Sequence, residues 1–340
     1  MRPGRANSLT DVAGITVGHY GRTDDGWLSG TTVVRALGEG AVGGVDVRGG
    51  APGTRETDLL APGNLVERVH AVVLSGGSAY GLAAACGVTD ALGEQGIGLA
   101  VGDSGLVVPI VPAAVIFDLG RGGDSRLRPD ASFGRAALAA ASGDAVAQGS
   151  VGAGLGALAA GVKGGVGSAS VKLGDGSTVA ALVVVNSSGS TAHPETGALY
   201  GAAYAIGAEF GDPVPVADPV ALAAAAQRAR PRLNTTIGVL ATDVTLGKDR
   251  CSRLATLGQD GLARAIRPVH TMGDGDTIFA LATCERPALD PYALDDLLAA
   301  AADCVTRAVA HAMLAATAVG EYATFSDLVP AGRTGPPDPA

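Results

Sequence analysis

The chain has 340 residues, of which 47% are hydrophobic and 17% are charged, so it can bury a large core and is neither disordered nor fibrous. Its formal net charge of −9 argues against binding to a phosphate backbone, because such binding relies on clustered lysine and arginine. We therefore expect a soluble globular protein that has no nucleic-acid partner.

The N-terminus, the longest uncharged stretch and the cysteines bear on where the protein works. Residues 1–14 contain two arginines but no apolar segment behind them, so no secretory signal is expected. The uncharged stretch of residues 145–162 is interrupted by polar residues and glycines and is a poor membrane span. We expect a cytoplasmic protein that has no membrane partner. The cysteines lack CxxC spacing and are expected to be reduced core residues; they are Cys86, Cys251, Cys284 and Cys304.

Strand and helix patterns alternate along the chain. Short runs rich in Val, Ile and Thr predict strands over residues 15–20, 31–36, 70–77, 114–119, 179–186, 236–244 and 277–283. Helical spacing between these runs predicts helices over residues 80–95, 133–141, 219–230, 248–267 and 291–317. This interleaving indicates a layered α/β or α+β fold. Because no linker and no fixed-period repeat is visible, we expect residues 1–340 to form a single domain.

The segment Leu233-Asn234-Thr235-Thr236-Ile237 places two hydroxyls directly after an asparagine and before a predicted buried strand. The simplest interpretation is the start of a strand that uses β-branched residues. The functional alternative is that Thr235 Oγ1 attacks the Asn234 carbonyl and forms an ester that water opens, which leaves a free amine on Thr235. An α-amino group has an ordinary pKa of about 7.7 to 8.0, so it can accept the hydroxyl proton near neutral pH. One residue then supplies both the nucleophile and the base.

A second segment, Gly273-Asp274-Gly275-Asp276-Thr277, leads into the strand predicted over residues 277–283. In an extended chain Asp274 and Asp276 point to the same face, because side chains alternate with period two. Two carboxylates on one face, with Gly275 leaving room for the backbone, suit holding an ammonium group and orienting a hydroxyl. The alternatives are a Gly/Asp turn before a strand, or a weak cation site.

Together these two segments resemble one family. Asn-Thr-Thr-Ile before a strand, followed further along by Gly-Asp-Gly-Asp-Thr-Ile-Phe-Ala, is similar to the DmpA-type aminopeptidases. That family includes β-aminopeptidases, D-stereospecific amidases and nylon-oligomer endohydrolases. Three further segments match in order, at residues 9–19, 49–56 and 74–82, and the resemblance runs from about residue 9 to residue 328.

This resemblance implies the fold and the processing of the chain. The fold would be α+β, a four-layer αββα sandwich of the type shared by the DmpA and ornithine acetyltransferase families. The chain would cut itself into residues 1–234, the α chain, and residues 235–340, the β chain. The resemblance also implies a homo-oligomer, which we expect to be a tetramer of cleaved αβ units.

Site residues carry over from the family at matching positions. Thr235, after Asn234, stands at the nucleophile, and Asn186 stands at an active-site asparagine whose side-chain N–H would stabilise the oxyanion. Asp274 and Asp276 match two aspartates of the nylon-oligomer hydrolases, whereas β-aminopeptidases have Ser-x-Glu there. The resemblance therefore favours the nylon-oligomer hydrolase branch. The two aspartates would orient the Thr235 amine.

The family's active-site lysine follows a Gly-Ala-Gly motif. Here residues 152–154 form that motif and lead to Lys163, slightly further along than in the family. In this role Lys163 would add positive charge beside the Thr235 amine and lower the pKa of that amine toward a usable base. The alternative is a plain surface lysine.

Two other motifs and the histidines do not indicate a nucleotide site, a serine nucleophile or a metal site. Residues 152–157 fit the loose GxGxxG/A pattern of a dinucleotide site, but residues 143–150 are too polar for the buried strand that such a site requires. Ser78 precedes a predicted helix as in a nucleophile elbow, but Tyr80 replaces the second glycine of GxSxG, so we expect a turn or capping serine. The histidines show no metal-binding spacing; they are His19, His70, His193, His270 and His311. We expect no metal and no cofactor.

The combined prediction is an amide hydrolase with an N-terminal threonine nucleophile. Its substrates would be small peptides or amino-acid amides, with aminohexanoate oligomers among them, and the stereochemistry and the exo or endo position of cleavage stay open. The first rival is an acyltransferase of the ornithine acetyltransferase type, because an acyl-threonine can pass its acyl group to an amine as well as to water. The second rival is an uncleaved, non-catalytic binding protein.

Overall fold

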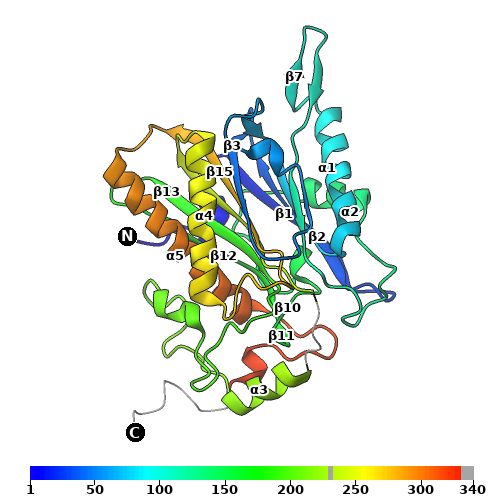
Figure 1. Ribbon diagram of the computed structural model, residues 1–340, viewed down its shortest axis with the longest axis vertical. Coiled ribbons are helices and arrows are strands. Elements are labelled where there is room, and N and C mark those ends of the chain that lie inside the picture. The colour runs from blue at the N-terminus through cyan, green and yellow to red at the C-terminus, as the bar shows by residue number, and fades with distance from the viewer. Residues whose placement is uncertain (229–232, 331–340) are drawn as a thin grey trace.

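Two β-sheets that face each other form the centre of the structure (Figure 1). The structure is a computed structural model, and it describes residues 1–228 and 233–330. Within them, one sheet has the strand order β1 (Ile15–Arg22), β2 (Ser29–Ala36), β6 (Ala71–Ser75), β9 (Ala113–Val115) and β4 (Thr54–Arg55). The other has the order β12 (Gly165–Lys172), β13 (Thr178–Val185), β14 (Ile237–Val244), β15 (Thr277–Arg286), β3 (Ala41–Val47) and β5 (Arg68–Val69).

Helices cover the outer face of each sheet. Against the first sheet pack α1 (Ala83–Glu94) and α2 (Ala131–Ala139); against the second pack α4 (Lys248–Ala265) and α5 (Pro291–Ala315). From right to left, Figure 1 shows α1 and α2, the first sheet, the second sheet, and then α4 and α5. The expected four-layer αββα sandwich is therefore confirmed.

Strand alternation explains why the sandwich has three apolar layers. Val34 of β2 faces the other sheet, whereas its neighbour Val33 faces α1 and α2. In the same way Val239 of β14 faces between the sheets, and Leu240 packs toward α4 and α5. Successive side chains of a strand point to opposite faces, so a strand covered on both faces is apolar at every position. This accounts for the run of Val, Ala and Leu residues in β13 and for the Val239-Leu240-Ala241 segment of β14.

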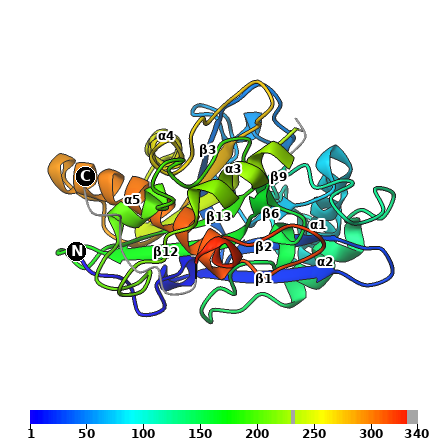
Figure 2. The ribbon, with the colours of Figure 1, turned by 90° about the horizontal axis from the view of Figure 1, so that it is seen from below.

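Smaller elements connect the layers. The hairpin β7 (Leu99–Val101) and β8 (Leu106–Val108) projects at the top of Figure 1, and the hairpin β10 (Leu158–Ala159) and β11 (Val162–Lys163) lies at the lower end. The helix α3 (Pro219–Arg228) packs against β11 at that lower end, which Figure 2 views from below. Short 3₁₀ turns are η1 (Leu9–Asp11), η2 (Asp58–Leu60), η3 (Ser78–Leu82), η4 (Gly152–Gly154), η5 (Tyr200–Tyr204) and η6 (Ser326–Leu328).

Local sequence sets the helix limits. Asp290 caps α5 by accepting hydrogen bonds from the backbone N–H groups of Tyr292 and Ala293, and Pro291 occupies the first turn. The helices expected over residues 248–267 and 291–317 each end two residues earlier, and the expected helix over 80–95 is divided into η3 and α1. The last two positions of the helix expected over 219–230 lie outside the described residues.

The helix α5 is the most apolar long helix in the described part of the chain to be considered as a membrane span. It is long and apolar enough, by length and composition, to cross a membrane. However, 72% of its most apolar window is buried inside the structure, because α5 lies against β12 and β13. This is the burial of a core helix in a layered fold.

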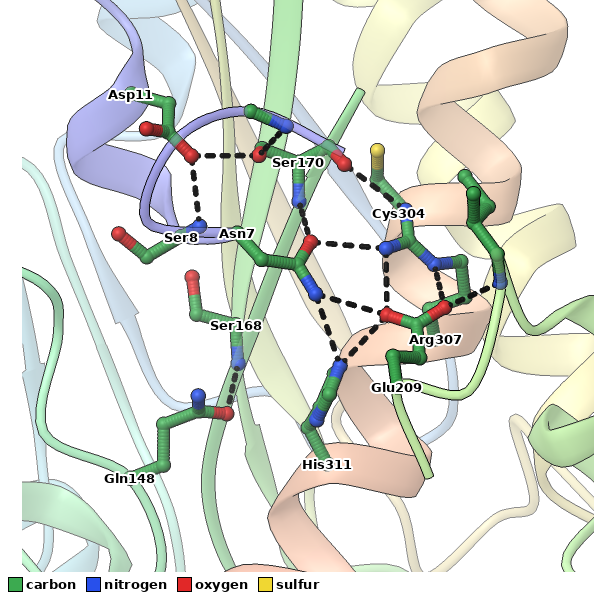
Figure 3. Close-up of polar contacts among 12 residues, drawn as sticks. Asn7, Ser8, Asp11, Gln148, Ser168, Ser170, Glu209, Cys304, Arg307 and His311 are labelled. Atoms are coloured by element: carbon green, nitrogen blue, oxygen red, sulfur yellow. Dashed lines mark hydrogen bonds and ion pairs between the residues drawn. The ribbon is translucent and has the colours of Figure 1, made fainter. Parts of the chain in front are cut away.

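A buried polar network attaches the N-terminal segment to α5 and β12 (Figure 3). The Arg307 side chain is fully buried and donates to both carboxylate oxygens of Glu209, at 2.7 and 2.6 Å, and to the Asn7 Oδ1 atom at 2.8 Å. His311 Nε2 lies 2.9 Å from the same carboxylate. Burial alone would raise the pKa of Glu209, but the hydrogen bonds from His311 and Arg307 outweigh it and hold that pKa well below its usual range.

We expect Glu209→Gln to lower the free energy of unfolding by about 3 kcal/mol, because it leaves the Arg307 charge buried without its partner. Urea unfolding at pH 7 measures this, with the exposed Glu195→Gln as the matched control. Because the Glu209 pKa is depressed in the fold, the contribution is present above its ordinary value of 4.5 and is lost as the pH falls below it. Equal unfolding free energies for the two variants would contradict this role of Glu209.

Candidate active site

The ends of three neighbouring strands bring the predicted site residues together. β13 runs antiparallel to β14, and β14 runs parallel to β15. Asn186 directly follows β13, and Thr235 and Asp276 lie just before β14 and β15, so all three meet at one edge of the sheet. The backbone N–H of Thr235 donates to the Asn186 carbonyl at 2.7 Å, and that of Thr236 donates to Asp276 Oδ1 at 2.7 Å.

Thr235 lies directly against the peptide bond that precedes it. Its side chain is buried, and its Oγ1 donates a hydrogen bond to the carbonyl oxygen of Asn234. The Asn234 backbone N–H is fixed in turn by the Gly273 carbonyl at 2.9 Å. The hydroxyl and the carbonyl group that self-cleavage would join are therefore neighbours.

Asn186 is placed beside Thr235 but is oriented differently from the expectation. Its Oδ1 accepts hydrogen bonds from Arg121 and, at 3.1 Å, from the Leu158 backbone N–H. Two donors on one atom identify that atom as the amide oxygen. Its Nδ2 donates toward the Phe117 carbonyl at 3.4 Å, not toward the Asn234 carbonyl. In this arrangement the main-chain oxygen of Asn186 positions the Thr235 nitrogen.

The carboxylates of Asp274 and Asp276 are both buried, and each receives hydrogen bonds from the protein itself. Asp276 accepts from Thr236 and also from His270, whose backbone nitrogen lies at 3.1 Å and whose Nδ1 lies at 2.7 Å. Asp274 accepts from the backbone N–H groups of Ser188 at 3.1 Å and Thr271 at 3.2 Å. The two carboxylates thus fix the segments around Thr235, and these contacts do not include the Thr235 nitrogen.

Lys163 is 1% exposed, so the alternative of a surface lysine is wrong. Its Nζ donates to the carbonyls of Gly154, Ala157 and Gly164 at 2.8, 3.2 and 2.7 Å. Burial, and then the positive charge of Arg121, lower the pKa of Lys163 to about 7. These contacts hold residues 154–164, from which Leu158 donates to Asn186.

Two residues of the site were not predicted from the sequence. Arg121 is 2% exposed and contacts both Asn186 and Asn234. His270 has a left-handed backbone, with φ of 56°, and holds Asp276. The only sequence features near them are the glycines on both sides of Arg121 and the closeness of His270 to the Asp274 segment. The glycines do not indicate the partners of Arg121, which lie 65 and 113 residues away in the chain, and the closeness of His270 to Asp276 does not by itself indicate a hydrogen bond between them.

A pocket of about 850 Å³ opens beside the Asn234–Thr235 bond. Near the bond it is lined by Arg121, Ser188, Asn234 and Gly273. Its other walls come from α3, β10 and the segment around Tyr322, and they include the charged side chains of Arg228 and Glu321. Concave sites of this size that carry a few convergent polar groups are typical of small-molecule binding. In residues 1–228 and 233–330, no group of three or more His, Cys, Asp or Glu side chains is arranged to hold a metal ion.

Comparison with known proteins identifies solved structures of the same fold. The β-aminopeptidase of Burkholderia sp. superimposes with a TM-score of 0.71 at 24% identity, over 96% of this chain and 93% of its own. The L-aminopeptidase D-Ala-esterase/amidase of Ochrobactrum anthropi gives a TM-score of 0.72 at 23% identity, over 96% and 91% of the two chains. Both share the αββα sandwich described above.

Relatives found by sequence have higher identity to this chain than these two solved structures have. An uncharacterized aminopeptidase of Mycobacterium tuberculosis (strain ATCC 25618 / H37Rv) is 51% identical, over 95% of this chain and 98% of its own length. The 6-aminohexanoate-oligomer endohydrolase of Paenarthrobacter ureafaciens is 32% identical, over 83% of this chain and 76% of its own. Residues 7–324 match Peptidase family S58. The predicted family resemblance is thus confirmed, and the chain belongs to Peptidase family S58 and is an amide-bond hydrolase.

Proposed function

We propose that the chain cuts itself between Asn234 and Thr235, and that the freed Thr235 then hydrolyses amide bonds of small peptides or amino-acid amides. The observation that carries this proposal is the buried Thr235 Oγ1 in contact with the carbonyl group of Asn234. Residues 1–234 and 235–340 would be the two pieces of the mature enzyme.

Self-cleavage needs no group from outside the chain except water. Thr235 Oγ1 attacks the Asn234 carbonyl carbon, the C–N bond breaks, and the hydroxyl proton passes to the Thr235 nitrogen. The resulting ester joins Asn234 to the threonine oxygen. Water then hydrolyses this ester, which yields a carboxylate on Asn234 and restores the hydroxyl of Thr235, now beside a free amine.

The surroundings of the Thr235 nitrogen support its use as a base. In the uncut chain this nitrogen donates to the Asn186 carbonyl at 2.7 Å, and the same oxygen can hold one N–H of the free amine. The lone pair of the amine is then available to take the Oγ1 proton when a substrate binds. The substrate carbonyl is attacked, an acyl-threonine ester forms, the amine product leaves, and water releases the acid.

The pocket supports short, polar substrates. Its lining includes two positive side chains, Arg121 and Arg228, and one negative side chain, Glu321, which suits a molecule that carries both a carboxylate and an ammonium group. The relatives' names, aminopeptidase and 6-aminohexanoate-oligomer endohydrolase, describe amide substrates of this type. We propose peptides, amino-acid amides and linear aminohexanoate oligomers as the substrates to test.

Mass spectrometry of the purified protein, N-terminal sequencing and an amide substrate panel test the proposal together. We expect two fragments, one of which begins at Thr235, and release of amine products from the panel. A coupled assay with acyl-ornithine and glutamate tests the acyltransferase alternative. A single intact chain that still hydrolyses amides would contradict the proposed nucleophile, and an intact inactive chain would favour the binding protein. Native mass spectrometry tests the proposed tetramer of cleaved units.

We expect Asp276→Asn to slow self-cleavage at least tenfold, about 1.4 kcal/mol, because the new amide NH₂ faces donors that now bond to carboxylate oxygens. The affected donors are the Thr236 N–H and two groups of His270. The uncut fraction is followed by mass spectrometry after expression. Asp260→Asn, an exposed position of α4, is the control and should cut at the rate of the unchanged chain. Equal rates for Asp276→Asn would show that this carboxylate does not position Thr236.

A further inference from the structure

Arg121 is a buried cation that touches the polypeptide on the acyl side of the Asn234–Thr235 bond. It lies in the segment that follows β9, so it reaches the site from the five-stranded sheet, whereas Asn186 and Thr235 belong to the other sheet. Its side chain is 2% exposed. A fully buried guanidinium is costly unless its N–H groups are hydrogen-bonded, so its partners indicate what it holds in place.

The two terminal nitrogens of Arg121 have different sets of partners. Nη1 donates to Asn186 Oδ1 and, at 3.4 Å, to the Gly156 carbonyl. Nη2 donates to Asn234 Oδ1 and, at 3.3 Å, to the Leu233 carbonyl. The guanidinium therefore joins the residue whose carbonyl is attacked to the asparagine whose main-chain oxygen holds the Thr235 nitrogen.

The planar shape of the group gives this contact a geometric consequence. A guanidinium presents its donors in a fixed fork, so two acceptors bound to it are held at a set distance and orientation. Asn234 cannot rotate away from Thr235 without breaking the hydrogen bonds to Nη2. Small misplacements of reacting groups are costly, about 100-fold in rate for a displacement near 1 Å.

We propose that Arg121 is a positioning residue for self-cleavage, which clamps Leu233 and Asn234 against Asn186 and so keeps the Asn234 carbonyl beside Thr235 Oγ1. This inference rests on the proposed function. In this role Arg121 neither contacts the reacting carbonyl oxygen nor transfers a proton.

The test compares variants of the full-length chain by the rate at which uncut protein disappears after synthesis. Arg121→Met removes all N–H donors of the side chain, and we expect self-cleavage to be at least 100-fold slower. Arg121→Lys supplies one point charge that cannot span both asparagines, so we expect an intermediate rate. The control is Arg126→Met, five positions further along, whose side chain is 86% exposed. It should cut at the rate of the unchanged chain.

Chemical rescue separates positioning from a general loss of structure. Arg121→Gly leaves a space for a free guanidinium ion, so millimolar guanidinium chloride should accelerate its self-cleavage, whereas the same concentration of urea should not. Unchanged cutting in Arg121→Met and Arg121→Lys, or no rescue of folded Arg121→Gly, would overturn the inference. An unchanged chain that itself stays whole would instead refute the proposed self-cleavage, and with it this role.

Discussion

Thr235→Ala is expected to leave one uncut chain and to reduce amide hydrolysis at least 1,000-fold, about 4 kcal/mol in transition-state stabilisation. Alanine removes the hydroxyl that lies against the Asn234 carbonyl, so no ester can form. Without that ester the amine of residue 235 is never released, and the base is lost together with the nucleophile. Mass spectrometry and an amidase assay on the same preparation measure both effects.

Thr235→Ser is the matched variant for this experiment. Serine keeps the hydroxyl and loses only the methyl group, so cleavage should still occur, at a rate that reflects the looser rotamer of an unbranched side chain. The result that would contradict the mechanism is a Thr235→Ala protein that still separates into two fragments, or one that stays whole and hydrolyses amides at the rate of the unchanged chain.

The fold could be predicted in those segments where strands are apolar on both faces. The runs that became β13, β14 and β15 are rich in Val, Leu and Ala because each is covered by helices on one face and by the other sheet on the opposite face. β3 and β12 were not predicted, because their sequences contain glycine and serine where strand propensity favours larger residues.

Helix packing explains these glycines. A Cβ atom added at Gly167 of β12 would lie 2.0 Å from the Ala308 carbonyl oxygen of α5, and one at Gly44 of β3 would lie 2.4 Å from the Cys251 backbone of α4. Only glycine permits helices to approach the sheet so closely at these points. Strand propensity is therefore misleading at these positions, because the packing of α5 and α4 against the sheet requires glycine there.

The candidate site could also be predicted only in part: its residues were predicted, but their hydrogen-bond partners were not. The resemblance placed Thr235, Asn186, Asp274 and Asp276 in the site, and the structure brings all four to one sheet edge. What each side chain bonds to could not be read from the sequence. The Asn186 amide is turned by Arg121, 65 residues away in the chain, and such a pairing has no periodic pattern.

Lys163 offers a test of how burial and hydrogen bonding compete. Burial and the Arg121 charge lower its pKa to about 7, yet its Nζ lies near three carbonyl oxygens, which match the three N–H donors of an ammonium group. Because its pKa is lowered, we expect the folded chain to lose this proton above pH 7, while the unfolded chain keeps it up to its ordinary pKa of 10.5. Within this window the unfolded state binds more protons, so stability rises with pH.

Comparison of the unchanged chain with Lys163→Met isolates this contribution, because methionine has a similar length and no proton to lose. The difference in unfolding free energy should shift in favour of the unchanged chain by up to about 1.4 kcal/mol for each pH unit between 7 and 10, and should be constant below pH 7. Urea unfolding at pH 6, 7, 8 and 9 measures it, with the exposed Lys172→Met as the control that should show no such slope. A constant difference across this range would mean that the carbonyls of Gly154, Ala157 and Gly164 hold Lys163 as an ammonium, and that its positive charge persists beside Arg121 throughout the working range of the Thr235 amine.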